Sequence, residues 1–450
     1  MTELYHPSIY DPRHPVQSYW EDTAGPPVEG WAPLARDEMC DVAIIGGGYT
    51  GLSAALHLAR DYGIEARVLE AGPPGWGASG RNGGFCGPSG AKMSVADMTA
   101  RFGEAETRRY FQTGIAAVEL VQALGRDEGI DFDAQGDGEY AVAHSARAAE
   151  ELDAYAATMT RVFGLPCQAL SREAFAERGY RGPECFGAMH QPVGFGLHPL
   201  KFVRGLARVA LRRGAKIHGE TPVIKWEKGN SSHRIITRGG TLTAKRVIIA
   251  TNGFTQDGLH KGMDGVLLPA ISNIITTRPL TAEERSAHAW TTANPIWDSR
   301  HLFYYYRMLR DGRFLIGARG NTTARPEDEI AMRARLTADL YRIWPGWRDV
   351  PISHYWRGFV CLSHALAPNV GVLDDDPSVA YAVGYHGSGV AWANWSGRAA
   401  ARLLADNARP AEAVPAVVGQ PLRRFPLAAL RVWYLRAAYA AYAVKDRLGL

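Results

Sequence analysis

Three glycines near the N-terminus are spaced for binding a dinucleotide. The segment Gly46-Gly47-Gly48-Tyr49-Thr50-Gly51 follows the pattern GxGxxG. In this pattern Gly46 permits a tight turn, Gly48 lets the backbone approach a pyrophosphate, and Gly51 lets helix and strand pack closely. The free N–H groups and the positive dipole at the start of the next helix favour phosphate. The expected contacts are Gly46, Gly48, Tyr49, Thr50 and Gly51.

The segments around this motif predict a β–α–β unit. Residues 41–45 are a short apolar run, residues 52–60 have helical spacing, and residues 67–70 form the next apolar run. Glu70 ends the second strand, where a carboxylate binds ribose hydroxyls and repels a 2′-phosphate. The alternative is a glycine-rich turn without function. The strand, the helix and Glu70 in their required order favour the dinucleotide.

Three further segments favour FAD over NAD. A glycine-rich loop with one Arg and one Asn, residues 76–84, stands where NAD dehydrogenases usually continue the β–α–β pattern. Residues 247–253 predict a strand that ends in a turn of small residues. Residues 384–390 precede a helix whose start can direct N–H groups at the flavin. The further contacts expected for FAD are Glu70, Ala71, Gly77, Ala78, Ser79, Arg81, Asn82, Gly83, Gly84, Val223, Ala250, Thr251, Asn252, Gly253, Gly387, Ser388, Gly389 and Val390.

Together these segments resemble the D-amino-acid-oxidase-like family of FAD-dependent oxidoreductases, and within it the γ-glutamylputrescine oxidase, glycine oxidase and sarcosine oxidase types. The similarity covers residues 18–447 and rests on Glu70 and on residues 46–51, 75–84, 250–253, 298–307 and 384–397. It implies an α/β plus α+β fold. A discontinuous Rossmann-type FAD-binding domain is expected beside an antiparallel-sheet substrate domain that covers the flavin ring.

The length of 450 residues also favours more than one domain, because single cores stop growing near ~250–300 residues. We expect an N-terminal arm over residues 1–36, anchored by Tyr19 and Trp20. The FAD-binding domain is expected to comprise residues 37–100, 196–260 and 350–408, and the substrate domain residues 101–195 and 261–349. Residues 409–450 are expected to form a linker and a basic amphipathic helix over 427–447. The elements expected between them are helices over 146–163 and 198–213, strands over 216–218, 234–237 and 246–250, and an antiparallel sheet over 271–318.

Residues 298–307 are the richest candidates for substrate contacts. On a strand Phe303, Tyr305 and Arg307 share one face, and Leu302, Tyr304 and Tyr306 share the other. The resemblance favours the Tyr305 and Arg307 face as the one that looks at the flavin. The alternative is that the tyrosines only pack the sheet and that Arg307 forms a surface ion pair.

Two more residues complete the candidate catalytic set of Tyr305, Arg307, Arg319 and His386. Arg319 ends the next strand, where it can bind a substrate carboxylate through two hydrogen bonds or lie in solvent as a turn residue. His386 lies in the loop expected to face the flavin. Relatives have Gly-Tyr-Ser-Gly-His-Gly there, whereas this chain has Ser and His exchanged, so the family's role for the histidine does not carry over.

Two positions weigh against a simple amino acid as substrate. Val360 stands where α-amino-acid oxidases have a carboxylate-binding Arg, with Arg357 displaced by three residues. Ala391 stands where sarcosine-oxidase-like members have a Lys. Cys361 is out of register for a covalent flavin bond, so we expect a buried thiol and non-covalent FAD. The five cysteines lie far apart and form no CxxC or Cys/His cluster, so no metal site is expected.

The sequence therefore predicts FAD-dependent oxidation of a primary or secondary amine. The resemblance implies that hydride leaves the carbon next to nitrogen for flavin N5, that the imine is hydrolysed, and that O2 is reduced to H2O2. One alternative is an oxidase of N-substituted glycines such as iminodiacetate or sarcosine, which requires cations such as Arg307, Arg319 and Arg357. A second is a dehydrogenase that passes electrons to a quinone or an electron-transfer protein. A structural flavin and an NAD-binding dehydrogenase are the remaining two.

Composition limits the partners. The net charge of +4 over 450 residues gives no case for nucleic acid. No run of ~18 apolar residues and no signal-peptide core is present, so we expect a cytoplasmic protein. The terminal helix is expected to pack on its own domain or on a partner subunit, with an anionic membrane surface as the alternative. The sequence leaves the oligomeric state open.

Overall fold

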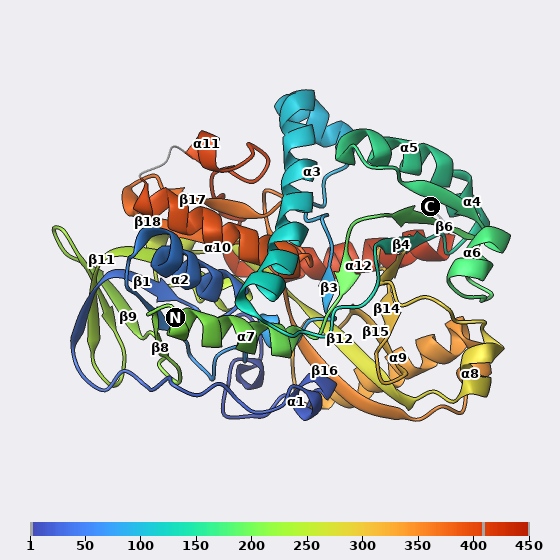
Figure 1. Ribbon diagram of the computed structural model, residues 1–450, viewed down its shortest axis with the longest axis horizontal. Helices are drawn as coiled ribbons and strands as arrows, with labels where there is room; N and C mark the ends of the chain where they lie inside the picture. Colours follow the sequence, from blue (N-terminus) through green and yellow to red (C-terminus); the bar gives the residue numbers. More distant parts are fainter. Residues whose placement is uncertain (1–2, 407–409, 449–450) are drawn as a thin grey trace.

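The computed structural model describes residues 3–406 and 410–448. Two eight-stranded sheets form its framework, and Figure 1 shows them as neighbouring units with the long helix α3 (Val95–Glu128) between them. Residues 1–2, 407–409 and 449–450, which belong to the predicted arm, FAD-binding domain and C-terminal segment, lie outside the described residues. The described helices include none long and apolar enough to cross a membrane.

The first sheet is the parallel sheet that the dinucleotide motif requires. Its central strands run parallel in the order β18, β11, β1, β2, β8, and β17 adds an antiparallel edge. The predicted β–α–β unit and the predicted strands near residues 216, 234 and 246 are confirmed. The strands are β1 (Glu38–Ile45), β2 (Ala66–Leu69), β8 (Lys216–His218), β9 (Lys225–Lys228), β10 (His233–Ile236), β11 (Thr241–Ile249), β17 (Asn369–Leu373) and β18 (Asp376–Val383).

Three helices pack together against this sheet (Figure 1): α2 (Tyr49–Tyr62), α7 (Pro199–Arg212) and α10 (Gly389–Ala405). Alternation along β1 explains the two layers, because Val42 and Ile44 join the core shared with the helices while Ala43 and Ile45 join the core on the other face. A Cβ on Gly397 would overlap the Thr50 carbonyl, so this glycine lets α10 approach α2 closely.

The second sheet has the order β16, β12, β15, β14, β13, β4, β6, β5. It corrects two expectations. Strand β16 was expected in the FAD-binding domain (residues 350–408) but pairs along most of its length with β12. The β13–β4 pair is parallel, whereas an antiparallel sheet was expected. The strands are β4 (Glu139–Val142), β5 (Gln168–Ser171), β6 (Gly187–Gln191), β12 (Leu267–Pro279), β13 (Ile296–Asp298), β14 (Tyr305–Met308), β15 (Arg313–Arg319) and β16 (Ile352–Ser363).

Helix α3 was not predicted, and it contacts both units: α10 on one side and α5 on the other. The helix expected over 146–163 is interrupted at Glu151 and forms α4 and α5. A short antiparallel pair of strands, β3 (Phe85–Cys86) with β7 (Phe195–Gly196), lies apart from the two main sheets. The remaining helices of the second unit are α4 (Ala146–Glu150), α5 (Leu152–Phe163), α6 (Arg172–Arg178), α8 (Ala282–Ala287) and α9 (Glu327–Ile343).

Both terminal segments pack on the body of the protein. Tyr19 and Trp20 in α1 (Tyr19–Thr23) are buried, and the Trp20 indole N–H donates to the Asn82 carbonyl at 2.9 Å, as the expected anchoring requires. After α11 (Pro410–Ala413), the chain ends in α12 (Arg431–Leu448). Val432 and Leu435 of α12 share a buried cluster with Tyr5 and with residues of β12, so packing on its own chain is confirmed.

Candidate active site

A large cavity of about 1780 Å³ runs from the end of the parallel sheet to the face of the second sheet. All the predicted FAD contacts line it except Gly51 and Gly84. The candidate catalytic residues Tyr305, Arg319 and His386 also line it, and Arg307 does not. The roles of these residues toward FAD and substrate stay predictions, but the sequence motifs meet in one place.

The glycine-rich turn leaves backbone open to the cavity. Gly46 has φ +111°, and a Cβ there would lie 2.6 Å from the Ala250 carbonyl oxygen. A Cβ on Gly48 would lie 2.7 Å from Ser79 Oγ. Gly51 serves packing, since its Cβ would overlap the Gly46 carbonyl. The first N–H groups of α2 have no helical acceptor, so this end of the cavity fits a phosphate.

Glu70 lies beside that turn, as the motif predicts. Its Oε1 accepts from the Gly72 N–H at 3.1 Å, and its Oε2 accepts from the Gly47 N–H. Burial raises the pKa of Glu70, which the surrounding N–H groups oppose. A buried carboxylate of this kind is suited to the hydroxyls of a ribose.

Arg81 is a buried cation that forms no ion pair with the described acidic residues. Its guanidinium lies 4.2 Å from the Trp76 ring centroid, and Nε donates to the Trp76 carbonyl at 2.8 Å. Nη2 is buried and has no hydrogen-bond partner among the described residues. Burial lowers the pKa of Arg81 to about 10. An anion in the cavity would satisfy this group, so the residues present fit the pyrophosphate of FAD.

The N-terminal arm takes part in the cavity wall, which was not predicted. Tyr10 and residues 11–14 line the cavity. The Tyr10 ring lies 5.5 Å from the Phe359 ring and 6.3 Å from the Phe254 ring, and both phenylalanines also line the cavity. The arm has no periodic pattern, so only its aromatic residues hinted at a buried role.

The start of α10 and the loop before it form another part of the cavity wall. His386 has φ +53°, and its Nε2 accepts from the Ser363 N–H at 3.3 Å. Burial, with Lys92 and Arg319 adding repulsion, lowers the pKa of His386 to about 3. The imidazole is therefore neutral and carries its proton on Nδ1, which has no partner among the described residues.

The second sheet presents Tyr305 and Arg319 to the cavity. The hydroxyls of Tyr305 and Ser272 are 2.8 Å apart, and the Tyr305 ring meets Phe85 edge-on at 5.5 Å. Tyr306 points to the opposite side, where its hydroxyl lies 2.8 Å from that of Tyr180 in a separate core. The predicted division of the two faces between Tyr305 and Tyr306 is confirmed, because strand alternation determines it.

Arg307 lies outside the cavity, which corrects its expected place. Its side chain is 1% exposed. The guanidinium donates to the Gly83 carbonyl at 3.1 Å and to the Leu197 carbonyl at 2.5 Å, and it lies 5.6 Å from the Trp20 ring centroid. Burial lowers its pKa to about 9. Arg307 thus stabilises the glycine-rich loop of residues 76–84 from outside the cavity.

Lys92 is a cavity residue that the motifs did not indicate. Its ammonium lies 4.8 Å from the Phe303 ring centroid and has no carboxylate partner among the described residues. The side chain is open to the cavity but enclosed by protein, and this desolvation, with repulsion from Arg319, lowers the pKa of Lys92 to about 8. Arg357, considered earlier as a cation for the substrate, instead pairs with Glu329 at 2.9 Å.

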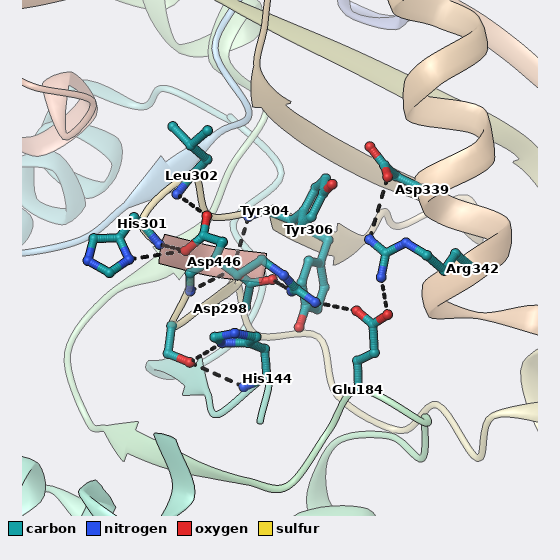
Figure 2. Close-up of polar contacts among 12 residues, drawn as sticks. His144, Glu184, Asp298, His301, Leu302, Tyr304, Tyr306, Asp339, Arg342 and Asp446 are labelled. Atoms are coloured by element: carbon teal, nitrogen blue, oxygen red, sulfur yellow. Dashed lines mark hydrogen bonds and ion pairs between the residues drawn. The ribbon is translucent and has the colours of Figure 1, made fainter. Parts of the chain in front are cut away.

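A polar network fixes the loop before β14, which carries Phe303 into the cavity (Figure 2). Asp446 of α12 accepts from the backbone N–H groups of His301 and Leu302 at 2.8 and 3.1 Å. Asp298 accepts from the Tyr304 N–H at 3.1 Å, and Arg300 links Asp298 to Glu184. The C-terminal helix therefore helps to position the substrate side of the cavity.

Comparison with known proteins identifies the family. The family model described as FAD dependent oxidoreductase matches residues 41–403. The chain belongs to this family of FAD-dependent oxidoreductases. It is 33% identical to a probable oxidoreductase OrdL of Rhizobium meliloti, covering 87% of this chain and 89% of that one. It is 29% identical to the gamma-glutamylputrescine oxidoreductase of Escherichia coli, covering 93% and 95%.

Solved structures of other FAD-dependent oxidoreductases share the fold. Glycine oxidase from Geobacillus kaustophilus superposes with a TM-score of 0.67 at 21% identity, covering 82% of this chain and 95% of that one. Iminodiacetate oxidase from Chelativorans sp. BNC1 gives 0.61 at 20% identity, covering 83% and 98%. The expected D-amino-acid-oxidase-like fold is thereby confirmed.

The position of Arg307 predicts a supporting role. We expect Arg307→Met to reduce retention of FAD on dialysis and to lower the thermal midpoint, because two carbonyls lose a charged donor worth about 1.5–3 kcal/mol each. KM of the fraction that keeps FAD should change little. Arg310→Met, which removes an exposed arginine three residues away, should leave both properties nearly unchanged. A raised KM with normal FAD retention would instead indicate that Arg307 contacts substrate.

Proposed function

We propose that this protein oxidises the C–N bond of a primary or secondary amine that also carries a carboxylate. The supporting observation is a pair of cations, Lys92 and Arg319, which line the cavity without an anionic partner among the described residues. Both are close enough to His386 to lower its pKa. Enclosed, unpaired charges are costly, and a substrate carboxylate would offset that cost.

These two cations offer an alternative to the residues that the chain lacks. Val360 lines the cavity where α-amino-acid oxidases have an Arg, and Ala391 is buried in α10 where sarcosine-oxidase-like members have a Lys. Arg319 and Lys92 approach from β15 and from the segment before α3 instead. The carboxylate would therefore be bound by different elements of the same fold.

The surroundings suit an amine in its neutral form. Phe85, Trp297, Phe303 and Tyr305 line the substrate side, and such an apolar wall disfavours an ammonium group and excludes water. Neutral His386 can donate its Nδ1 proton. When bound, FAD would accept a hydride from the carbon next to nitrogen. The amine thereby loses two electrons and two protons, water hydrolyses the imine to a carbonyl compound and a smaller amine, and O2 becomes H2O2.

The names of relatives agree with this class of donor. One relative is named as acting on γ-glutamylputrescine, which is an amine that carries a carboxylate. We infer non-covalent FAD, because burial raises the pKa of the Cys361 thiol and so disfavours the thiolate that a covalent bond would require.

Anaerobic reduction of the purified protein tests the function. We expect flavin absorption near ~450 nm that is bleached by N-substituted glycines and far less by alkylamines of equal length, because only the former offer a carboxylate. Air should restore the band and yield H2O2. A band that air does not restore, but a quinone does, would favour the dehydrogenase. A protein that cannot bind FAD, or a flavin that no amine bleaches, would contradict the proposal.

The two cations predict a pH dependence for binding of a simple carboxylate. Lys92 is charged below its pKa of about 8 and neutral above it. We expect propionate, followed by the change in the flavin spectrum, to bind about 10-fold more weakly as pH rises past 8. Lys92→Met should bind it weakly at every pH. Arg319→Met should weaken binding about 10- to 100-fold and retain the pH step.

Glu139, a buried carboxyl of the cavity, also has a pKa of about 8 and needs a control. The pH step should persist in Glu139→Gln and disappear in Lys92→Met. The opposite pattern would show that Lys92 does not bind the carboxylate.

A further inference from the structure

Glu139 is a buried acid with an unused oxygen that the proposed reaction does not explain. It begins β4, is 6% exposed and lines the cavity. Its Oε2 accepts from the Gln191 side-chain amide at 2.9 Å, while Oε1 has no hydrogen-bond partner among the described residues. A buried carboxyl that is half satisfied is costly, so the site is suited to one more donor.

The described residues offer Glu139 no cationic partner. Within the described part of the chain, no Lys, Arg or His forms an ion pair with Glu139, and burial alone raises its pKa to about 8. The other buried acids of the cavity differ: Glu70 accepts from backbone N–H groups, and Asp298 pairs with Arg300. Among these three carboxyls, only Glu139 has neither a cation nor a backbone N–H as a partner within the described residues.

The surroundings of Glu139 are those of an ammonium site. Tyr155, Phe111 and Phe85 line the same cavity, and Tyr155 is close enough for Glu139 to raise its pKa. A carboxylate with an aromatic ring nearby favours an alkylammonium through both its charge and its methylenes. A Cβ on Gly87 would overlap the Glu139 carboxyl, so this glycine makes room for the carboxyl itself.

The sheet register gives the distance between Glu139 and Tyr305, which lies on the substrate side of the cavity. Tyr305 pairs with Trp297 on β13, and Trp297 pairs with Ala141 on β4. Glu139 lies two residues before Ala141 and so shares its face of the sheet. The path crosses two strand-to-strand spacings and then runs two residues along β4, at right angles to them. These lengths put the Cα atoms of Tyr305 and Glu139 about 12 Å apart. An extended molecule can therefore contact both.

We propose that Glu139 forms a second subsite of the cavity, which binds the ammonium group of a substrate that carries a further amine remote from its carboxylate. The proposal rests on the proposed function and names its substrate class. The substrate would thus be bound at both ends. Lys92 and Arg319 would bind its carboxylate, and Glu139 would bind its distal ammonium group. The reacting nitrogen would lie between them.

A matched pair of ligands tests this subsite. N-(4-aminobutyl)glycine and N-pentylglycine have equal length and differ only in the terminal group. We expect the oxidised protein, mixed anaerobically in a stopped-flow instrument and followed through the flavin spectral shift that precedes any bleaching, to bind the ammonium compound about 10- to 100-fold more tightly. Glu139→Gln should remove this preference by weakening the ammonium compound alone. Its amide carbonyl can still accept from Gln191, so the fold should be retained.

Two controls complete the design. Glu177→Gln removes one negative charge from an exposed position on α6 and should keep the preference. Glu139→Asp should keep part of it. Equal binding of both ligands by the wild type, or equal weakening of both by Glu139→Gln, would overturn the subsite. Failure of the proposed function is distinguishable, because in that case neither ligand bleaches the flavin whatever the binding preference.

Discussion

The cavity between the two sheets contains more hydrogen-bond donors and cations than the protein itself satisfies. Two helices begin at its edge, where their first N–H groups have no acceptor within the helix, and Arg81, Lys92 and Arg319 add three cations that lack anionic partners within the described residues. Parallel strands create this situation, because they bring the starts of α2 and α10 to one edge of the first sheet. The second sheet forms the other wall of the cavity. Both the phosphate end at α2 and the region of Lys92 and Arg319 are therefore suited to anionic ligands.

The acidic residues of the cavity show how environment separates roles. Glu70 is surrounded by N–H groups of the glycine-rich turn, which suits a carboxylate that binds hydroxyls. Glu139 has one amide donor, lies near Tyr155 and has no cationic partner among the described residues. Neither Lys92 nor Arg319 contributes to the raised pKa of Glu139, so the cations and this acid lie apart in the cavity. Such a charge distribution selects an elongated molecule over a small one.

Local pattern predicted the cofactor side of the site because its determinants are short. The GxGxxG segment, Glu70 and the turn before α10 each carry their own geometric requirement, and their places in the cavity follow from parallel pairing. Alternation likewise predicted that Tyr305 and Tyr306 face opposite ways. It did not show that Arg307 would be covered by residues 83 and 197, because that contact joins segments far apart in sequence.

Sequence patterns did not predict the residues whose place in the structure depends on contacts between distant segments of the chain. Lys92 belongs to no motif, and only the folded chain brings it to the cavity wall. Strand β16 reads like any buried strand, and only its pairing with β12 assigns it to the second sheet. The arm has no periodicity, and its place over the cavity depends on aromatic contacts with Phe254 and Phe359. Glu139 belongs to no motif, and strand β4, which it begins, was not predicted.

The most direct measurement of the central claim is the anaerobic rate of flavin bleaching by an N-alkylglycine deuterated at both carbons next to nitrogen. We expect deuterium to slow the bleaching of the wild-type flavin several-fold, because a C–H bond next to nitrogen breaks in that step. The bleaching rate should also saturate as the ligand concentration rises. Bleaching at the same rate for both isotopologues in a chemistry-limited reaction, or no bleaching at all, would contradict the claim that this cavity oxidises a carboxylate-bearing amine.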